Sequence, residues 1–228
     1  MKTSIFAILA TITAAAAAPS QAVVIAPGTA DIAPQAFTTI AGTQGTLLAS
    51  KTVAGSAFTF ATSVNAAVYR NTFGTLDFYY QVSRTGRGTL AGAAGNQMID
   101  KFTASDFLGF TVDGYASAGD PDAGGFFRAA NNPPSSTTTF GRSTDGAVIQ
   151  LDFGTNGLAG TEVSATYVFR TNARAFTQGT FGVIDGSSFS GLAFSPTAVP
   201  EPATWGLMVG GFAMVGFAAR RRNKTVAA

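Results

Sequence analysis

Apolar and polar residues alternate one by one in several segments of the middle of the chain. Residues 162–169 show this most clearly, with apolar side chains at each odd position from Val163 to Phe169. The same alternation runs through 76–82 and 149–153. Because successive side chains of a strand point to opposite faces, this period of two predicts strands with one buried face and one face in water.

Less regular apolar runs predict further strands, separated by turn residues. These strands are expected at 47–53, 57–61, 64–70, 107–113, 137–142, 179–184 and 189–194. Asparagine or aspartate precedes glycine at several of the breaks, as in Asp145-Gly146 and Asp185-Gly186. Short strands at regular spacing indicate a mainly β fold, here an antiparallel β-sandwich or jelly-roll-like single domain.

Two stretches, Thr85–Gly95 and Gly114–Pro134, are rich in glycine and small residues and are expected to be long loops. Loops held by a rigid scaffold carry the binding residues of many proteins. Others only connect strands, and the sequence leaves both interpretations open.

The first 22 residues are typical of a secretory signal peptide. Lys2 supplies the positive start, an apolar stretch runs from Ile5 to Ala18, and small residues precede a cleavage position after Ala22. The alternative is an uncleaved N-terminal anchor.

The last thirty residues contain a second segment that is not part of the body. Pro200-Glu201-Pro202 is followed by an uncharged run, Ala203–Ala219, and then by Arg220, Arg221 and Arg222. A helix over 202–219 would be roughly 27 Å long, at about 1.5 Å per residue. That length predicts a single transmembrane helix with its arginines on the cytoplasmic side. An ordinary single-span anchor is the alternative to a processed signal.

This tail resembles the PEP-CTERM sorting signal, in the variant with Trp205 three residues after the second proline. Gly206 stands where the variant usually has alanine, and six residues follow the arginines. The resemblance implies export in a Gram-negative bacterium, processing near Pro-Glu-Pro by the membrane enzyme exosortase, and release to the cell surface. It divides the chain into a signal peptide (1–22), an exported β domain (23–198) and a sorting signal (199–228).

Two body segments are similar to stretches that recur in exported PEP-CTERM proteins. They are Val68–Asn71 with Gly74–Tyr80, and Phe169–Ala173 with Phe181–Gly186. The similarity implies a shared extracellular β domain and brings no activity or catalytic residues with it.

Charge excludes nucleic acid as a partner. The whole chain has a formal charge of +2, but Val23–Val199 contains nine basic and 11 acidic residues. The exported body is therefore slightly acidic, and the basic tail is a topology signal. The chain has no cysteine and no histidine, which excludes disulfides, thiolate nucleophiles, Cys/His zinc sites and a Ser-His-Asp triad within it.

Carboxylates are the remaining candidates for chemistry. Asp113, Asp120 and Asp122 lie in or beside the longest loop, and hard oxygen ligands on a glycine-bearing loop are what calcium requires. The alternative is a solvated loop with turn-forming aspartates. A glycosidase needs two facing carboxyl groups, and Glu162 is the body's single glutamate. No catalytic residue and no cofactor other than this calcium is expected.

Tyr79 and Phe127 are candidate exposed aromatic residues. Tyr79 could stack on a sugar ring, or pack against neighbouring strands, which the sequence favours.

Together these features predict a non-catalytic surface or extracellular-matrix protein, with exosortase as its sorting partner and transient insertion in the inner membrane. Association with exopolysaccharide or biofilm is implied by the resemblance alone. The alternatives are a carbohydrate-binding or calcium-dependent adhesion module and, less favoured, a secreted glycoside hydrolase.

Overall fold

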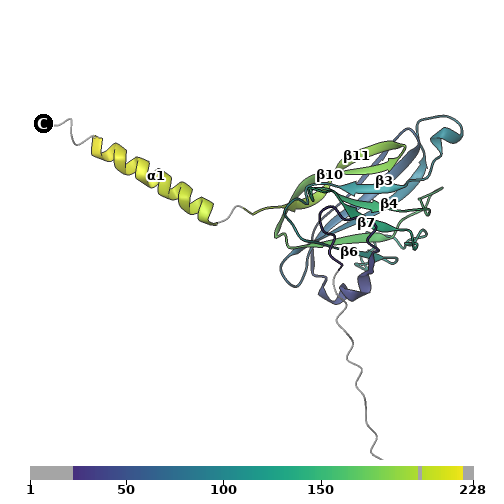
Figure 1. Cartoon of the computed structure of the whole chain (residues 1–228), viewed down its shortest axis with the longest axis horizontal. Helices are drawn as coiled ribbons and strands as arrows, with labels where there is room; N and C mark the ends of the chain where they lie inside the picture. Colours follow the sequence, from purple (N-terminus) through teal and green to yellow (C-terminus); the bar gives the residue numbers. More distant parts are fainter. Residues whose placement is uncertain (1–22, 200–201, 223–228) are drawn as a thin grey trace, which may run out of the picture.

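The computed structural model describes residues 23–199 and 202–222. The body consists of two β-sheets, and one long helix follows them (Figure 1). The predicted signal peptide with its cleavage position at Ala22 lies outside the described residues, as do Pro200 and Glu201.

The larger sheet, called sheet A, has six strands in the order β1-β6-β9-β4-β3-β2. Its strands are β1 (Gln35–Ala36), β6 (Val112–Ser117), β9 (Thr166–Thr171), β4 (Leu76–Arg87), β3 (Phe60–Arg70) and β2 (Thr46–Ser56). Neighbouring strands are antiparallel except β1 and β6, which pair in parallel. The short helices η1 (Phe37–Thr39) and η2 (Ala41–Thr43) lead from β1 into β2.

The second sheet, called sheet B, has five antiparallel strands in the order β11-β10-β5-β8-β7. They are β11 (Ser187–Thr197), β10 (Ala175–Asp185), β5 (Lys101–Ala104), β8 (Ile149–Asp152) and β7 (Thr139–Arg142). The short helix η3 (Ala93–Gly95) precedes β5. The two sheets confirm the predicted sandwich-like, mainly β architecture.

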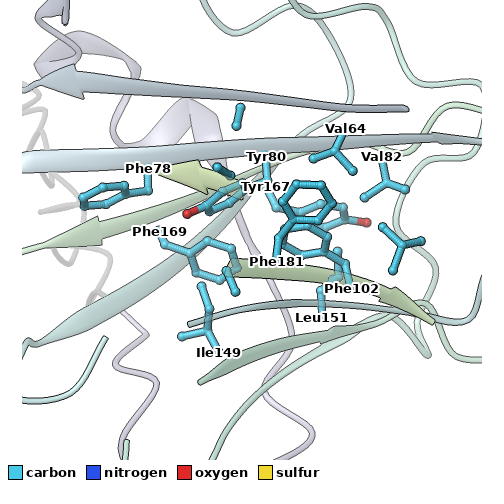
Figure 2. Packing of buried hydrophobic residues seen from close by; sticks show 14 of the residues in the cluster. Val64, Phe78, Tyr80, Val82, Phe102, Ile149, Leu151, Tyr167, Phe169 and Phe181 are labelled. Carbon is cyan, nitrogen blue, oxygen red and sulfur yellow. The ribbon is translucent and has the colours of Figure 1, made fainter. Parts of the chain in front are cut away.

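Aromatic side chains fill the space between the sheets, as Figure 2 shows. Tyr80 of sheet A contacts Phe102 of sheet B with ring centroids 5.1 Å apart, and Phe102 stacks on Phe181 at 6.1 Å. Phe78, Tyr80 and Val82 are the alternate residues of β4 that the sequence pattern assigns to the buried face. The period of two therefore predicted the inner face of this strand correctly.

The expectation of a wet outer face is wrong for β4 and β9. A second apolar cluster covers the outer side of sheet A, and it joins Phe37 and Ile40 to Tyr69, Tyr79, Tyr115, Phe127 and Val168. Tyr79 and Phe127 are both buried and their rings stack at 5.9 Å. The packing interpretation of Tyr79 is confirmed, whereas the expectation that Phe127 is exposed is wrong.

Several strand boundaries differ from the prediction. Residues 60–61 of one predicted strand and 64–70 of the next belong to one continuous strand, β3, which begins only at Phe60 and has a register shift between Ala61 and Thr62 where it pairs with β4. Strand β5 was not predicted, and the strand expected at 107–113 begins only at Val112. The two long loops are shorter than expected because β4 continues to Arg87 and β6 includes Gly114.

Helix α1 (Pro202–Arg222) follows β11 after four residues and stands apart from the sandwich in Figure 1. Proline suits the first turn of a helix because the amide groups there have no partner within the helix. The predicted helix is thus present and extends to Arg222. The predicted transmembrane span is not confirmed, since no helix within the described residues was found long and apolar enough to cross a membrane.

Candidate functional site

The C-terminal tail begins directly where the last strand of the body ends. Strand β11 ends at Thr197 and the backbone of Pro202, Trp205, Arg220, Arg221 and Arg222 lies in α1. Among residues 206–217, whose side chains are described, Leu207, Phe212 and Phe217 are more than two-thirds exposed. The whole sandwich is therefore complete before the tail starts.

The two aspartates of the long loop, Asp120 and Asp122, lie together and organise the loop itself. Asp120 accepts hydrogen bonds from the amide of Asp122 at 3.3 Å and from the amide of Gly125 at 2.8 Å. Asp122 accepts one from the amide of Gly124 at 3.0 Å and a short one from the Tyr69 hydroxyl. All four carboxylate oxygens are thus engaged by donors of the chain.

The two carboxyl groups have opposite pKa shifts. Burial and the neighbouring Asp122 raise the pKa of Asp120. Burial also acts to raise the pKa of Asp122, but hydrogen bonds from Asp120, Tyr69 and Gly124 outweigh it and lower the pKa overall. Asp122 is therefore the more readily ionised of the two carboxyl groups.

Asp113 does not join this pair. It lies on β6, where it is the register partner of Arg170 on β9. No group of three or more acidic side chains that could hold a metal ion is found within 23–199 and 202–222. The structure therefore brings two of the three calcium candidates together and separates the third.

A buried ion pair joins the two body segments that resemble other exported proteins. Arg170 donates from Nη2 to Oδ2 of Asp77 at 2.7 Å and from Nε to Oδ1 at 3.0 Å, and the Asp77 side chain is fully buried. Asn71 donates to Asp77 Oδ1 at 2.8 Å, and Arg170 also donates to Thr43 at 2.9 Å. These residues hold strands β4 and β9 to the 37–45 segment, which is a structural role.

Asp113 and Tyr79, near this ion pair on sheet A, each have a buried polar atom without a hydrogen bond. Among the described residues, neither Oδ1 of Asp113 nor the Tyr79 hydroxyl has a hydrogen-bond partner, although both atoms are buried. Burial raises the pKa of Asp113, while Arg170 lowers it by a smaller amount. An ionised Asp113 is therefore a source of instability beside the ion pair.

Glu162, the residue that a glycosidase mechanism would need, is engaged in holding loops. Its Oε2 accepts hydrogen bonds from Nδ2 of Asn132 at 2.9 Å and from the amide of Ala159 at 2.7 Å. Within the described residues these contacts account for Glu162 as a loop anchor.

Arg142 has a prominent role that the sequence patterns do not reveal. Its buried guanidinium donates to the carbonyl oxygens of Ile25, Phe107, Phe110 and Gly146, at 2.6 to 3.1 Å. The only signal in the sequence is an arginine just before a turn, in a body that has few charges. The contacts indicate that Arg142 ties the N-terminal segment to two loops.

The comparisons with known proteins identify the tail and not the body. Neither the curated proteins nor the solved structures contain a match to the chain. Residues 198–222 match the family described as the PEP-CTERM protein-sorting motif. The chain is therefore a PEP-CTERM protein, and by this motif it belongs to the substrates of exosortase.

Proposed function

We propose that this chain is a non-catalytic protein of the cell surface or extracellular matrix, which exosortase sorts through residues 198–222. One observation carries the proposal. The matched motif starts one residue after β11 ends, so cleavage near Pro200–Pro202 would leave every strand of the sandwich in the exported product. The sorting step and the folded body are thus separable along the chain.

The exposed apolar side chains of α1 support a role at the membrane. Residues such as Leu207, Phe212 and Phe217 are exposed in the isolated chain. Large contiguous apolar surfaces usually mark a site of interaction with a protein or a membrane. We propose that the lipid bilayer or the intramembrane enzyme covers this helix until the chain is processed.

A non-catalytic body fits the contacts of its acidic side chains. Asp120, Asp122 and Glu162 accept hydrogen bonds from the loops in which they lie, and Asp77 is in a buried ion pair. Each of these groups has a structural explanation. Association with exopolysaccharide is proposed from the family resemblance, with no contribution from the geometry.

Terminal peptide mass spectrometry on protein recovered from the surface of the producing cells tests the sorting proposal. We expect an N-terminus at Val23 and a C-terminus close to Pro200–Pro202. Glu201→Ala should leave full-length tail peptides in the membrane fraction. Lys224→Ala removes a tail charge outside the matched residues and should be processed like the wild type. Peptides beyond Trp205 in the surface protein would overturn the proposal.

The polysaccharide association has its own test. The recovered surface protein is sedimented with and without exopolysaccharide purified from the same cells. Co-sedimentation that exceeds a control with an unrelated neutral glucan would support a matrix role. Equal sedimentation with both polymers would leave a sorted surface protein without a matrix ligand.

A further inference from the structure

The two sheets have long edge strands on one side and short ones on the other. Sheet A ends in β2 and sheet B ends in β11, each of 11 residues, whereas the opposite edges are β1 with two residues and β7 with four. A long edge strand offers unpaired amide and carbonyl groups to another strand. The long-edged side is therefore the place where a further strand could add.

Of the two long edges, β2 is protected and β11 is not. Strand β2 contains Lys51 and a register irregularity between Leu47 and Ala49 where it pairs with β3, and both features discourage pairing with another chain. Strand β11 has no charged residue, and its pairing with β10 runs without a shift from Ser187 to Thr197. A neutral, regular edge accepts a partner strand without burying a charge.

Hydrogen bonds on the other side of β10 show which groups of β11 are free. The amide of Asp100 donates to the carbonyl of Ile184, and the amide of Ser105 donates to the carbonyl of Thr180. The backbone amide and carbonyl groups of the even-numbered residues of β10 therefore point toward β5. In an antiparallel ladder the amide and carbonyl of one residue point the same way and alternate along the strand. Odd-numbered residues of β10 therefore bond to β11.

The register then assigns the free edge of β11. Phe181 of β10 is opposite Gly191, so the backbone groups of odd-numbered residues of β11 bond to β10. The backbone amide and carbonyl groups of the even-numbered residues, called outward residues, point away from β10. Pro196 agrees with this assignment, because a residue without an amide hydrogen fits an outward position of an edge strand. The Tyr80 hydroxyl donates to the carbonyl of Phe194, which is also an outward residue. The backbone amide and carbonyl groups of Ser190 and Leu192 therefore point away from β10.

We propose that β11 pairs in antiparallel fashion with β11 of a second copy of this chain, around a two-fold axis at Leu192. In that register Leu192 lies opposite itself, and its outward amide and carbonyl groups meet those of the second copy. Ser190 lies opposite Phe194, whose carbonyl already accepts a hydrogen bond from Tyr80, so the Leu192 pair is the centre of the contact. The inward residue Gly191 lies opposite the inward residue Ala193. Sheet B of one copy would continue into sheet B of the other with both inner faces on the same side.

A second copy fits this edge better than an unrelated strand because the strand is self-complementary. A two-fold interface requires one surface that matches itself. The outward face of β11 carries no charge that would repel its own copy, and Leu192 is 49% exposed at the centre. Two leucines directly opposite each other on neighbouring strands would cover one another.

A charge-swap experiment at Leu192 tests the pairing on full-length protein, by sedimentation velocity over a range of concentrations. The wild type should form a dimer. Leu192→Lys alone and Leu192→Glu alone should each weaken the dimer at least tenfold, because like charges would lie opposite each other. An equimolar mixture of the two variants should restore it. Leu108→Lys, at a leucine that is 64% exposed in a loop, is the matched control and should dimerise like the wild type.

A cross-link gives an independent measurement, since the chain has no cysteine of its own. Opposed residues in a hydrogen-bonded antiparallel pair have Cα atoms about 5.5 Å apart, which a disulfide can bridge. Leu192→Cys should therefore form a covalent dimer on mild oxidation, and Leu108→Cys should stay monomeric. A monomeric wild type at every concentration, or dimers of Leu192→Lys as stable as those of the wild type, would overturn the proposal. The proposed pairing of β11 does not depend on the sorting motif.

Discussion

Asp77 and Arg170 lie opposite each other on the neighbouring strands β4 and β9 and form a two-point ion pair on the outer side of sheet A. The Asp77 carboxylate is fully buried, and the Arg170 side chain is 13% exposed. A buried charge is tolerated only with a partner. The pair therefore makes each residue depend strongly on the other.

Removing one member of this pair should be more harmful than removing both. Arg170→Met leaves the Asp77 carboxylate buried without its cation, and breaking a buried pair in this way costs about 3–5 kcal/mol. The double variant Asp77→Leu/Arg170→Met removes both charges of the pair and should regain a large part of that loss. Urea unfolding of the three proteins measures the difference. A double variant at least as unstable as Arg170→Met would contradict this account.

Two neighbouring tyrosines of β4 should respond differently to loss of their hydroxyl groups. Tyr80 donates to the carbonyl of Phe194, and Tyr80→Phe should cost about 1 kcal/mol. The Tyr79 hydroxyl lies beside Gln44 but has no hydrogen-bond partner among the described residues. Tyr79→Phe should therefore be neutral or slightly stabilising. Thermal unfolding of both variants checks the contrast, and equal losses of stability would contradict it.

The sequence predicted the inner faces of the strands because that information is local. Alternation in 76–82 assigns Phe78, Tyr80 and Val82 to the core whatever the rest of the chain does. The tail could be recognised for the same reason, since its prolines, apolar run and arginines are contiguous. Both predictions depend only on residues next to each other in sequence.

The second apolar cluster, on the outer side of sheet A, could not be predicted, because it depends on contacts between segments that are distant in the sequence. Phe37 reaches Tyr79 from the short helix η1 and Phe127 reaches it from a loop, and neither segment has a hydrophobic period that predicts this contact. Asp113 and Asp120 are close in sequence, yet the strand carries Asp113 to Arg170 and leaves Asp120 in the loop. Spacing along the chain could not distinguish a shared site from two separate ones.

Calcium should have little effect on the body. The four carboxylate oxygens of Asp120 and Asp122 already accept hydrogen bonds from chain donors. A cation would have to replace those contacts. We expect the melting temperature to be the same with excess calcium and with a chelator. A rise of several degrees on adding calcium, abolished by Asp120→Asn, would instead establish a calcium site in this loop.

Asp113 should make the folded protein less stable as the pH rises. Burial raises the pKa of its carboxyl group in the folded state, so the folded chain holds this proton more tightly than the unfolded chain. Its contribution is most favourable below an unfolded pKa of about 3.9 and is lost as the pH rises through the higher folded pKa. Asp113→Asn should remove that loss. Urea unfolding at pH 4 and pH 7 measures it.

Asp145 provides a control of opposite sign. Hydrogen bonds from Ser143 and the amide of Ala147 lower the pKa of Asp145. Its contribution is therefore present at neutral pH and is lost as the pH falls through the lowered pKa. Asp145→Asn should weaken the protein at pH 7 more than at low pH. If both variants changed stability by the same amount at the two pH values, the burial of Asp113 would not be the cause.

Gly114 on β6 lies where the inner face of sheet A has no room for a side chain. A Cβ atom there would be 2.4 Å from Cε2 of Phe140 and 2.8 Å from Cδ1 of Ile25. Gly114→Ala should therefore cost about 1–3 kcal/mol, as overpacked cores do. Gly119→Ala, in the following loop, meets no atom within 4 Å and should leave stability almost unchanged. Urea unfolding compares them, and an equally mild effect at both sites would show that Phe140 yields without strain.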